Sequence, residues 1–324
     1  MIVARTIDEL RETINGSCVT IGNFDGVHLG HQRLMARTCA KARKRGLISV
    51  VVTFDPHPMT VLMGQQKTPP FITSTAQRLR FIERQGPNVA LVLEFTRQMA
   101  SLEPVDFIRR YLVEGLALRE MVIGYDYAMG KGRKGNYELL STLGQELGFG
   151  VERLDPVIVG GAVVSSTRIR DLIQSGNVWD ARPLLGRFFE VEGEVVDGMK
   201  RGAAQLGFPT ANLRLSGTLL PKPGVYAVWA EVDGELHQAV ANVGVNPTFG
   251  DTGLTLEAHI LDFDRNIYGS QVSLQFVQRL RSERKFESIE ALKARIADDV
   301  RLGRVILATA DAQPGSDPSG DEDE

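Results

Sequence analysis

Short apolar segments alternate with amphipathic stretches along the first half of the chain. Residues 18–21 (CVTI) and 47–54 (LISVVVTF) are apolar and rich in β-branched side chains, which predicts two buried strands. Between them, residues 31–45 place apolar side chains on one helical face, and Gly46 follows as a typical helix C-cap. The alternation continues with helical patterns at 75–85 and 104–114 and strand-like runs at 90–95, 121–125 and 157–159. This half therefore predicts an α/β domain with a parallel sheet covered by helices.

From Phe188 onward the pattern changes, and apolar and polar residues alternate between glycine and asparagine turns. Such short alternating strands predict an antiparallel β-barrel or sandwich. A last helix is expected after Ser288, which suits an N-cap. Its buried stripe is predicted to consist of Ile289, Leu292, Ile296 and Val300.

The boundary between the two halves is predicted at residues 182–187 (RPLLGR), because a proline and a glycine there are typical of a hinge. We therefore expect domains at 1–182 and 183–306. The remaining segment, 307–324, ends in acidic residues and is poor in apolar ones, which predicts a disordered tail.

Composition narrows the class of protein. A length of 324 residues is enough for two domains with sizeable cores. A net charge of −3 argues against a general nucleic-acid binder. Two cysteines without a CxxC spacing predict reduced thiols, and the sequence contains neither a signal-peptide pattern nor an apolar run of about 18 residues. We expect a cytoplasmic protein with no membrane or nucleic-acid partner; an oligomer is not predicted.

The richest candidate for chemistry is the histidine loop, residues 22–31 (GNFDGVHLGH), which lies between the first buried strand and its helix. A helix start offers unpaired N–H groups and a positive dipole end to an anion, and His28 and His31 add donors there. These groups suit nucleotidyl transfer onto an existing phosphate, which needs stabilised charge rather than a strong base. The residues alone leave two alternatives, a helix cap with a solvated histidine or a zinc site.

A second phosphate-binding candidate lies near the end of the first half. Ser165, Ser166 and Thr167 open a short predicted helix, and Arg168 and Arg170 lie in its first turn. Hydroxyls, free N–H groups and guanidinium groups can together bind phosphates. The alternative is an N-cap followed by two exposed arginines.

Two further loops of the first half are weaker candidates for ligand binding. Residues 53–58 (TFDPHP) end the second strand, and their prolines stiffen a loop at the sheet edge where α/β folds bind ligands. The alternative is a structural turn. Residues 130–135 (GKGRKG) match GxGxxG but do not follow the first strand, so we interpret them as a mobile basic loop near phosphates rather than a dinucleotide fingerprint; a solvated loop is the alternative.

The second half offers a different set of groups. The chain contains no GxxxxGK[ST] phosphate loop. Instead, Thr210 and Asn212 of the segment 207–212 (GFPTAN) offer neutral oxygens that suit magnesium, although the segment by itself is only a polar turn. In residues 254–260 (LTLEAHI) the apolar side chains share one face, so Glu257 points to the other, where it can deprotonate an alcohol. An exposed glutamate is the alternative.

In these motifs the sequence resembles the bacterial bifunctional riboflavin kinase/FAD synthetase (FMN adenylyltransferase) family. The histidine loop matches the HxGH signature of nucleotidylyltransferases, VSSTRIR (164–170) matches their ISSTxxR element, and TFDPHP occupies the same place in the family. The PTAN motif and NPTF…EAH (246–259) match riboflavin kinases. The resemblance covers about residues 15–300, with the motifs of both halves in order.

The resemblance implies a Rossmann-like nucleotidylyltransferase domain followed by a riboflavin kinase β-barrel with a C-terminal helix. It implies an enzyme of FAD biosynthesis that uses ATP and Mg²⁺. The second half would phosphorylate riboflavin to FMN, and the first would adenylylate FMN to FAD with release of pyrophosphate. The alternatives are an enzyme with only one of these activities and a flavin-binding protein without turnover.

Carried over residue by residue, the resemblance makes Glu257 the base of the kinase and His28 and His31 catalytic in adenylyl transfer. The implied nucleotide-binding residues are Gly22, Asn23, Phe24, His28, Gly30, His31, Ser165, Ser166, Thr167, Arg168, Gly207, Thr210 and Asn212. The implied flavin-binding residues are Phe54, Pro56, His57, Pro58 and Asp126, and the implied magnesium ligands are Thr210 and Asn212. The chain departs from the family at Met129, where an aromatic residue is usual, and at 203–206 (AAQL), which lacks the usual arginine.

Overall fold

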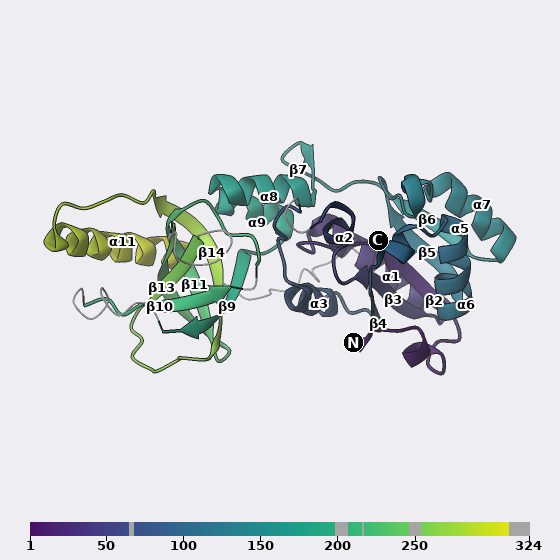
Figure 1. The fold of residues 1–324 in the computed structure, drawn as a ribbon, viewed down its shortest axis with the longest axis horizontal. Helices are drawn as coiled ribbons and strands as arrows, with labels where there is room; N and C mark the ends of the chain where they lie inside the picture. The colour runs from purple at the N-terminus through teal and green to yellow at the C-terminus, as the bar shows by residue number, and fades with distance from the viewer. Residues whose placement is uncertain (65–67, 198–206, 216, 246–253, 311–324) are drawn as a thin grey trace. The chain divides into compact units, whose positions relative to one another are not determined.

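The computed structural model describes residues 1–64, 68–197, 207–215, 217–245 and 254–310 (Figure 1). Contacts divide the chain into two compact units, Met1–Ser166 and Thr167–Glu324. This division falls after the first residue of helix α8 (Ser166–Ser175) and before α9 (Val178–Leu185), helices that the predicted limit of 182 places wholly or mostly in the first domain. Helix α9 contacts strands β9 and β14 of the second unit, so it is described with that unit. The domain limits 1–182 and 183–306 remain predictions.

The N-terminal unit is built on a parallel sheet of six strands in the order β1-β4-β3-β2-β5-β6, which confirms the predicted architecture. The strands are β1 (Ile2–Ala4), β2 (Ser17–Ile21), β3 (Ile48–Phe54), β4 (Val89–Leu93), β5 (Leu118–Gly124) and β6 (Gly150–Leu154). Strands β2 and β4 are buried along their whole length. Their β-branched and apolar residues therefore suit a sheet that is covered on both faces.

One predicted strand of this half does not join the sheet. Strand β7 (Ile158–Val159) pairs antiparallel with β8 (Ala162–Val163) in a small hairpin. Gly160 and Gly161 connect the two strands, and both have positive φ, which favours such a tight turn. The sixth strand of the sheet is instead β6, whose sequence GVERL is too polar to be recognised as a buried strand.

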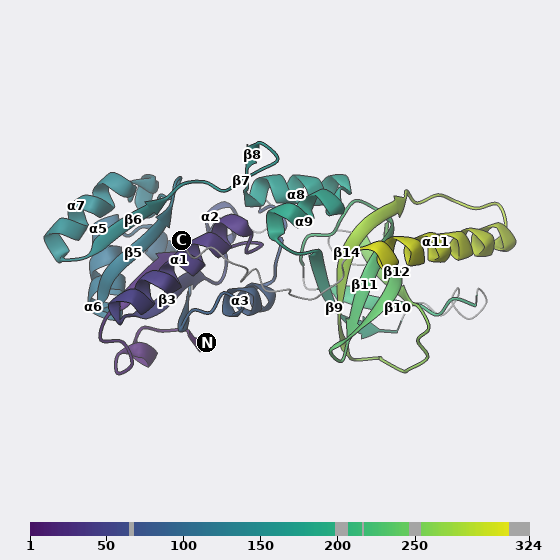
Figure 2. The same ribbon diagram turned by 180° about the vertical axis from the view of Figure 1, so that it is seen from behind.

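Helices cover both faces of the sheet (Figure 2). One face packs against α1 (Leu29–Arg45) and α3 (Thr75–Glu83), and the other against a helical stretch from Pro104 to Leu116 and against α7 (Tyr137–Leu147). The stretch comprises α5 (Pro104–Phe107), a π-helical segment η3 (Ile108–Val113) and α6 (Glu114–Leu116). The shorter helices are η1 (Asp8–Leu10), α2 (Pro58–Met63), α4 (Arg97–Ala100) and η4 (Lys131–Arg133).

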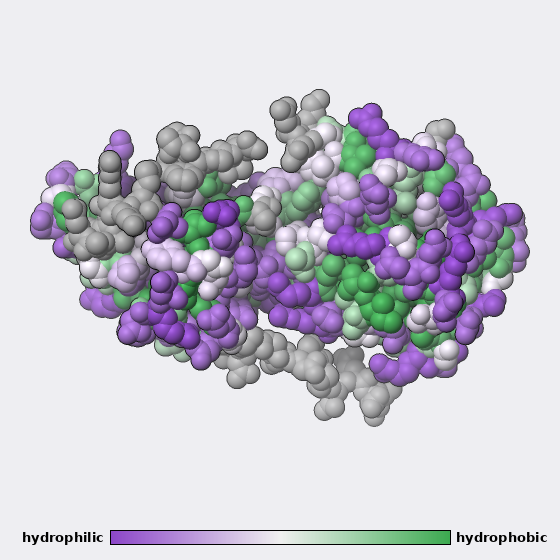
Figure 3. Space-filling view, turned by 60° about the horizontal axis from the view of Figure 1, so that its bottom comes forward, coloured by the Kyte–Doolittle hydropathy of each residue, from purple (hydrophilic) through white to green (hydrophobic). Residues whose placement is uncertain are grey.

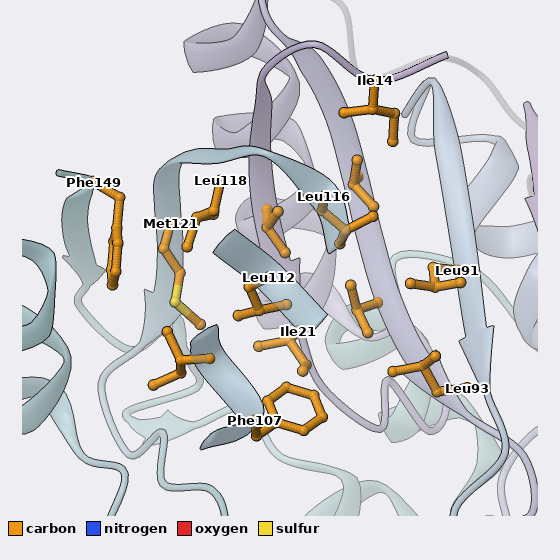
Figure 4. Packing of buried hydrophobic residues seen from close by; sticks show 14 of the residues in the cluster. Ile14, Ile21, Leu91, Leu93, Phe107, Leu112, Leu116, Leu118, Met121 and Phe149 are labelled. Carbon is orange, nitrogen blue, oxygen red and sulfur yellow. The ribbon is translucent and has the colours of Figure 1, made fainter. Parts of the chain in front are cut away.

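Side chains from both kinds of element interlock in the core of this unit. Figure 4 shows part of the cluster on one face of the sheet, including Phe107, Leu112 and Ile21. Val50 and Val52 of β3 belong to this cluster, whereas Val51 belongs to the cluster on the other side of the sheet. This alternation is the period of two expected of a strand. Outside the core, hydrophilic residues cover much of the molecular face in Figure 3, with hydrophobic patches between them.

The C-terminal unit contains a closed antiparallel barrel in the order β10-β13-β12-β11-β14-β9, which decides between the barrel and the sandwich that the sequence allowed. The strands are β9 (Phe189–Val196), β10 (Ala211–Leu215), β11 (Gly224–Val232), β12 (Glu235–Val245), β13 (Leu254–Ile260) and β14 (Gln271–Arg281). Buried and partly exposed residues alternate strictly along β9. Inside the barrel, the ring of Phe276 contacts those of Phe189 and Tyr226 at centroid distances of 5.9 and 5.3 Å.

The last helix, α11 (Ile289–Thr309), begins as predicted with Ser288 as N-cap, whose Oγ accepts from the N–H of Ala291 (3.1 Å). Its predicted buried stripe is wrong. Ile289 is 53% exposed, and the buried positions are Asp299, Gly303 and Leu307. The helix packs against the barrel through its second half, where Gly303 allows close approach to Val240 and Asp299 pairs with Arg281.

Two other predicted boundaries fall at helix ends. Residues 182–185 belong to α9, and Gly186, with φ of +70°, caps this helix by donating to the carbonyl of Arg182, so the hinge stays a prediction. A glycine after a helix can thus mark a C-cap rather than a linker. Helix α11 extends to Thr309, beyond the predicted start of the tail at 307, and residues 311–324 lie outside the described part of the chain.

Candidate active sites

Three loops of the N-terminal unit gather at the carboxyl edge of its sheet. The histidine loop follows β2, residues 55–58 follow β3, and Asp126 follows β5. Strand β2 pairs with β3 on one side and with β5 on the other, and the direction in which strands are added reverses between them. Open α/β sheets bind ligands at this edge, beside such a reversal. The structure thus shows that these three loops share one edge of the sheet, which the sequence indicated only through their motifs.

The two histidines of the histidine loop lie against each other at the start of α1. His28 is the N-cap, and its Nδ1 accepts from the N–H of His31 (3.4 Å). Their rings stack at a centroid distance of 3.6 Å, and the edge of Phe24 meets His31 at 5.2 Å. A Cβ on Gly30 would lie 3.1 Å from Cε1 of His28, so the glycine leaves room for that ring. His28 is a cap but not a solvated one, since it is only 6% exposed.

Asp25, which the sequence analysis did not single out, fixes the histidine loop to two other segments. Its buried carboxylate accepts hydrogen bonds from the N–H groups of Ile72 (3.2 Å) and Thr73 (3.1 Å). Its carbonyl accepts from Oγ of Ser166 (2.8 Å). Ser166 therefore lies at the histidine loop, and Thr167 and Arg168 follow it directly in the chain.

Aromatic side chains surround the loop after β3. The ring of Phe54 meets that of Phe95 edge-on at 5.4 Å, and the ring of His57 lies 4.5 Å from Phe71. His57 caps α2, with its Nδ1 accepting from the N–H of Met59 (3.2 Å), and Pro58 begins that helix. This arrangement suits a planar ligand, because aromatic rings stack on flat ring systems.

The loop after β5 contains the departure from the family pattern. Asp126 is exposed, and its carbonyl accepts from Nη2 of Arg133 (3.4 Å). Met129 is partly buried, and its sulfur accepts from the hydroxyl of Tyr127 (3.4 Å). The methionine thus packs beside an aromatic residue although it does not supply one itself.

In the barrel, three polar residues lie side by side on adjacent strands. Glu257 of β13 pairs in register with Asn212 of β10 on one side and with Asn242 of β12 on the other. Nδ2 of Asn242 donates to Oε1 of Glu283 (3.4 Å), just beyond the end of β14. Sequence reasoning found Asn212 and Glu257 but missed Asn242 and Glu283, because the sequence gives neither the register of β12 against β13 nor the contact with the residues after β14.

Glu257 lies in an environment that disfavours its charge. Burial raises the pKa of its carboxyl above the usual value, and the negative charge of Glu283 raises it further. A carboxylate whose pKa is raised is a better proton acceptor than an ordinary glutamate. Its partial burial therefore favours the role of a base over that of a glutamate on a solvated face.

A cavity of about 310 Å³ lies at β10 and β13, where its lining includes Ala211 and Ala258, the neighbours in sequence of Asn212 and Glu257. Pro209 and Thr210 line one part of it, and Ile260, Phe263 and Tyr268 supply apolar surface. His259 holds Pro209 in place, because its Nδ1–H donates to the Pro209 carbonyl (2.7 Å). The cavity therefore combines the Thr210 hydroxyl with a largely apolar wall, as a pocket for a nucleotide base and its phosphates requires.

Thr210, which lines the cavity, offers a hydroxyl, and the paired residues Asn212 and Glu257 offer an amide oxygen and a carboxylate. Such oxygens suit Mg²⁺ better than a softer metal. Among the described residues, no group of three or more His, Cys, Asp or Glu side chains is placed to hold a metal ion. The predicted contributions of 198–206 and of the NPTF motif at 246–249 lie outside the described residues.

Two family models match the chain in succession. One described as FAD synthetase matches residues 10–168, and one described as riboflavin kinase matches residues 185–307. The bifunctional riboflavin kinase/FMN adenylyltransferase of Pseudomonas fluorescens is 38% identical over 309 residues, which cover 95% of this chain and 98% of the relative. The enzyme of the same name from Escherichia coli (strain K12) is 36% identical over 306 residues, which cover 94% of this chain and 97% of the relative.

A solved structure has the same fold over nearly its whole length. The crystal structure named macrolide-efflux protein from Streptococcus pneumoniae matches with a TM-score of 0.83 and 33% identity, covering 94% of this chain and 99% of that one. In the part of the present chain that the structure describes, no helix has the length and apolar character needed to cross a membrane. Given two family models in the expected order and relatives similar along their full length, the chain belongs to the family of bifunctional riboflavin kinases/FMN adenylyltransferases.

Proposed function

We propose that this chain makes FAD from riboflavin in two steps, each in a different unit. The barrel transfers the γ-phosphoryl group of ATP to riboflavin, giving FMN and ADP. The N-terminal unit transfers the adenylyl group of a second ATP to FMN, giving FAD and pyrophosphate. The observation that carries this proposal is the occurrence of two separate sets of polar groups, one at the histidine loop and one around Glu257.

In the kinase step, a neutral alcohol must lose its proton as it attacks the γ-phosphorus of ATP. We assign this proton to the carboxylate of Glu257, whose raised pKa supports the role. The oxygen of riboflavin forms the new bond to phosphorus, and the bond to the β-phosphate oxygen breaks to release ADP. Thr210, which lines the cavity of about 310 Å³, would contact the nucleotide.

Thr210 and Asn212 would bind Mg²⁺ together with the phosphates of ATP. Their neutral oxygens fit a hard cation that draws most of its negative ligands from the nucleotide. The metal would neutralise charge on the transferred phosphoryl group. The two side chains themselves orient the phosphates, since Thr210 lines the cavity and Asn212 lies opposite Glu257 in the strand register.

In the adenylylation step, the nucleophile is the phosphate of FMN, which is already an anion. Its oxygen attacks the α-phosphorus of ATP, and pyrophosphate leaves, so no strong base is needed. His28 and His31 would stabilise negative charge on the reacting phosphates together with the N–H groups at the start of α1. Ser165, Ser166, Thr167 and Arg168 would bind the departing pyrophosphate, and the loop around Phe54 and His57 the flavin.

We also infer a cytoplasmic location. The two cysteines, Cys18 and Cys39, are both free and buried, which suits a reducing compartment. Both substrates of the proposed reactions, a flavin and ATP, are small molecules, so the proposal needs no nucleic-acid or membrane partner.

The test is to supply purified protein with riboflavin and Mg-ATP and to separate the flavins by chromatography. FMN is expected first and FAD later, with pyrophosphate released in step with FAD. Supplying FMN in a separate reaction distinguishes a bifunctional enzyme from one with a single activity. Flavin binding without either product from folded protein would contradict the proposal and favour a non-catalytic flavin-binding protein.

A further inference from the structure

Arg78 is a buried cation that neither proposed reaction uses. It lies in the first turns of α3, is 4% exposed, and contacts two main-chain carbonyls. Its Nη1 donates to the carbonyl of Asn23 (3.1 Å), and its Nη2 donates to the carbonyl of Phe54 (2.8 Å). Its Nε is buried without a hydrogen-bond partner among the described residues. A buried guanidinium whose hydrogen-bond partners among the described residues are all neutral is uncommon and needs an explanation.

The two carbonyls belong to different substrate loops. The Asn23 carbonyl lies in the histidine loop, directly before Phe24, whose φ of +52° is rare for a residue with a side chain. Thr53 also donates to that carbonyl through its Oγ1 (3.3 Å). The Phe54 carbonyl lies where β3 ends and the loop of residues 55–58 begins. One guanidinium thus connects the segment predicted to hold ATP with the segment predicted to hold the flavin.

Arg78 is itself held firmly in place. Ser74 and Gln77 form a capping box at the start of α3, so the backbone that carries Arg78 is fixed. Immediately before this cap, the N–H groups of Ile72 and Thr73 donate to the carboxylate of Asp25. Two sets of hydrogen bonds therefore attach the start of α3 to the histidine loop, one made by Asp25 and the other by Arg78.

The charge of Arg78 is not neutralised by a direct ion pair. Asp25 and Asp55 favour the charged form from nearby, but burial has the larger effect and lowers the pKa of the guanidinium. Asp25 is engaged by main-chain N–H groups, and Asp55 accepts from Thr75 and Arg5. Retaining a cation here is costly for stability, so a purely structural connection would be better made by a neutral side chain.

We propose that Arg78 is a positioning residue for FMN adenylylation, which sets the separation between the histidine loop and the loop after β3 by binding one carbonyl of each. The inference rests on the proposed function of the N-terminal unit. Reacting atoms must approach to about 3–3.5 Å, and displacing a substrate by about 1 Å can cost about 100-fold in rate. Loss of either hydrogen bond would let the two loops, and the substrates on them, move apart.

The experiment compares Arg78→Gln and Arg78→Lys with Arg80→Gln, an exposed arginine on the same helix, all in the full-length chain. FAD formation from FMN is measured at varied ATP and FMN, and FMN formation from riboflavin serves as an internal control. For Arg78→Gln we expect kcat of FAD formation to fall about 100-fold, with smaller changes in KM and an unchanged kinase rate. Arg78→Lys keeps the positive charge but lacks the planar guanidinium that donates to both carbonyls. Its kcat should therefore lie between those of Arg78→Gln and wild type. Arg80→Gln should stay within about twofold of wild type.

Two further measurements separate positioning from loss of folding. Thermal unfolding shows whether the N-terminal unit of each variant is folded at the assay temperature. If Arg78→Gln is unfolded, Arg78→Ala is assayed at lower temperature with added methylguanidinium, which should restore part of the FAD-forming rate by occupying the vacated space. The kinase rate should not respond to methylguanidinium.

Several outcomes would overturn the inference. They are wild-type kcat for FAD formation in folded Arg78→Gln, full activity of Arg78→Lys, and equal losses in both reactions. A failure of methylguanidinium to raise the rate of Arg78→Ala above that of the untreated variant would also count against it. A wild-type chain that forms no FAD from FMN would instead overturn the proposed function, and the inference with it.

Discussion

Glu257 and His28 are assigned different tasks because their substrates differ in charge. Riboflavin offers a neutral hydroxyl, so the kinase site requires a base, whereas FMN offers an anionic phosphate, so the other site requires stabilisation of charge. The environments agree with this division. Glu257 is partly buried beside another carboxylate, and His28 lies at the positive end of a helix.

The first prediction separates the two sites by single substitutions. Glu257→Ala removes the proposed base, so the rate of FMN formation should fall by about 10²- to 10⁴-fold while FAD formation from FMN continues. His28→Ala should have the reverse effect. Each rate is measured by chromatography with riboflavin or FMN as the supplied flavin. Loss of both activities from either single, folded variant would show that the sites are not assigned correctly.

The second prediction concerns the pH dependence of the kinase. Glu257 must be ionised to accept a proton, so kcat/KM should rise with pH as this group, whose pKa is raised, loses its proton. Glu283→Gln removes a nearby negative charge, which favours the ionised form and lowers the pKa of Glu257. The rise should therefore move to lower pH. Glu287→Gln, another exposed glutamate of the same segment that does not affect the pKa of Glu257, is the control and should leave the profile in place. An unmoved profile in Glu283→Gln would contradict the coupling.

At the scale of elements, helix α11 is attached to the barrel by a buried ion pair as well as by apolar contacts of its last turns, including Leu307. The carboxylate of Asp299 is 2% exposed and lies 2.7 Å from Nη2 of Arg281, with Nε of Arg295 at 3.3 Å. Periodicity counts a charged residue as outward-facing, so this arrangement was not predictable from hydrophobic spacing. Arg281 ends β14, the strand that precedes α11, and only folding brings it to Asp299.

The third prediction tests this attachment. Asp299→Asn leaves Arg281 buried without its counter-charge, so the free energy of unfolding of the barrel should fall by about 3–5 kcal/mol. Asp298→Asn on the same helix removes an exposed pair with Arg301 and should cost less than about 1 kcal/mol. Denaturant unfolding followed by circular dichroism measures both. Similar small losses in the two variants would mean that α11 is held mainly by its apolar contacts.

At the scale of the whole molecule, the two proposed reactions follow one another, because FMN, the product of the kinase, is the substrate of the other site. FMN leaves the kinase as the phosphate monoester that the other site requires as nucleophile. The proposed catalytic residues lie in different units, with His28 and His31 in the first and Glu257 in the second, whereas Thr167 and Arg168, proposed to bind pyrophosphate, are assigned by contacts to the second unit. The proposed base of the kinase and the proposed histidines of adenylyl transfer are therefore independent of each other.

The fourth prediction follows from this independence. A mixture of the Glu257→Ala and His28→Ala proteins should convert riboflavin to FAD, because one variant makes FMN and the other consumes it. FMN should accumulate before FAD appears, and dilution of both proteins should lengthen that delay. If the mixture made no FAD although each variant retained its own half-reaction, FMN would have to pass between sites within one molecule.

Much of the fold and most of the candidate site were predictable because they depend on local patterns. The β-branched runs at 18–21 and 47–54, the period-two alternation around Glu257 and the glycine after α1 each encode an element by short-range sterics and burial. The histidine loop and the PTAN segment were recognisable for the same reason, since each places its chemical groups within a few residues.

The sequence by itself determined two architectures, their order and the principal polar residues, because these depend on contiguous motifs and on the periods of helices and strands. Only the tertiary structure decided which distant groups meet. Arg78 joins two loops, Asn242 and Glu283 extend the row beside Glu257, and Asp299 turns inward to Arg281. The physical reason is that a polar residue can be buried when the fold supplies its hydrogen-bond or ion-pair partner. The local sequence pattern does not encode where that partner lies in space.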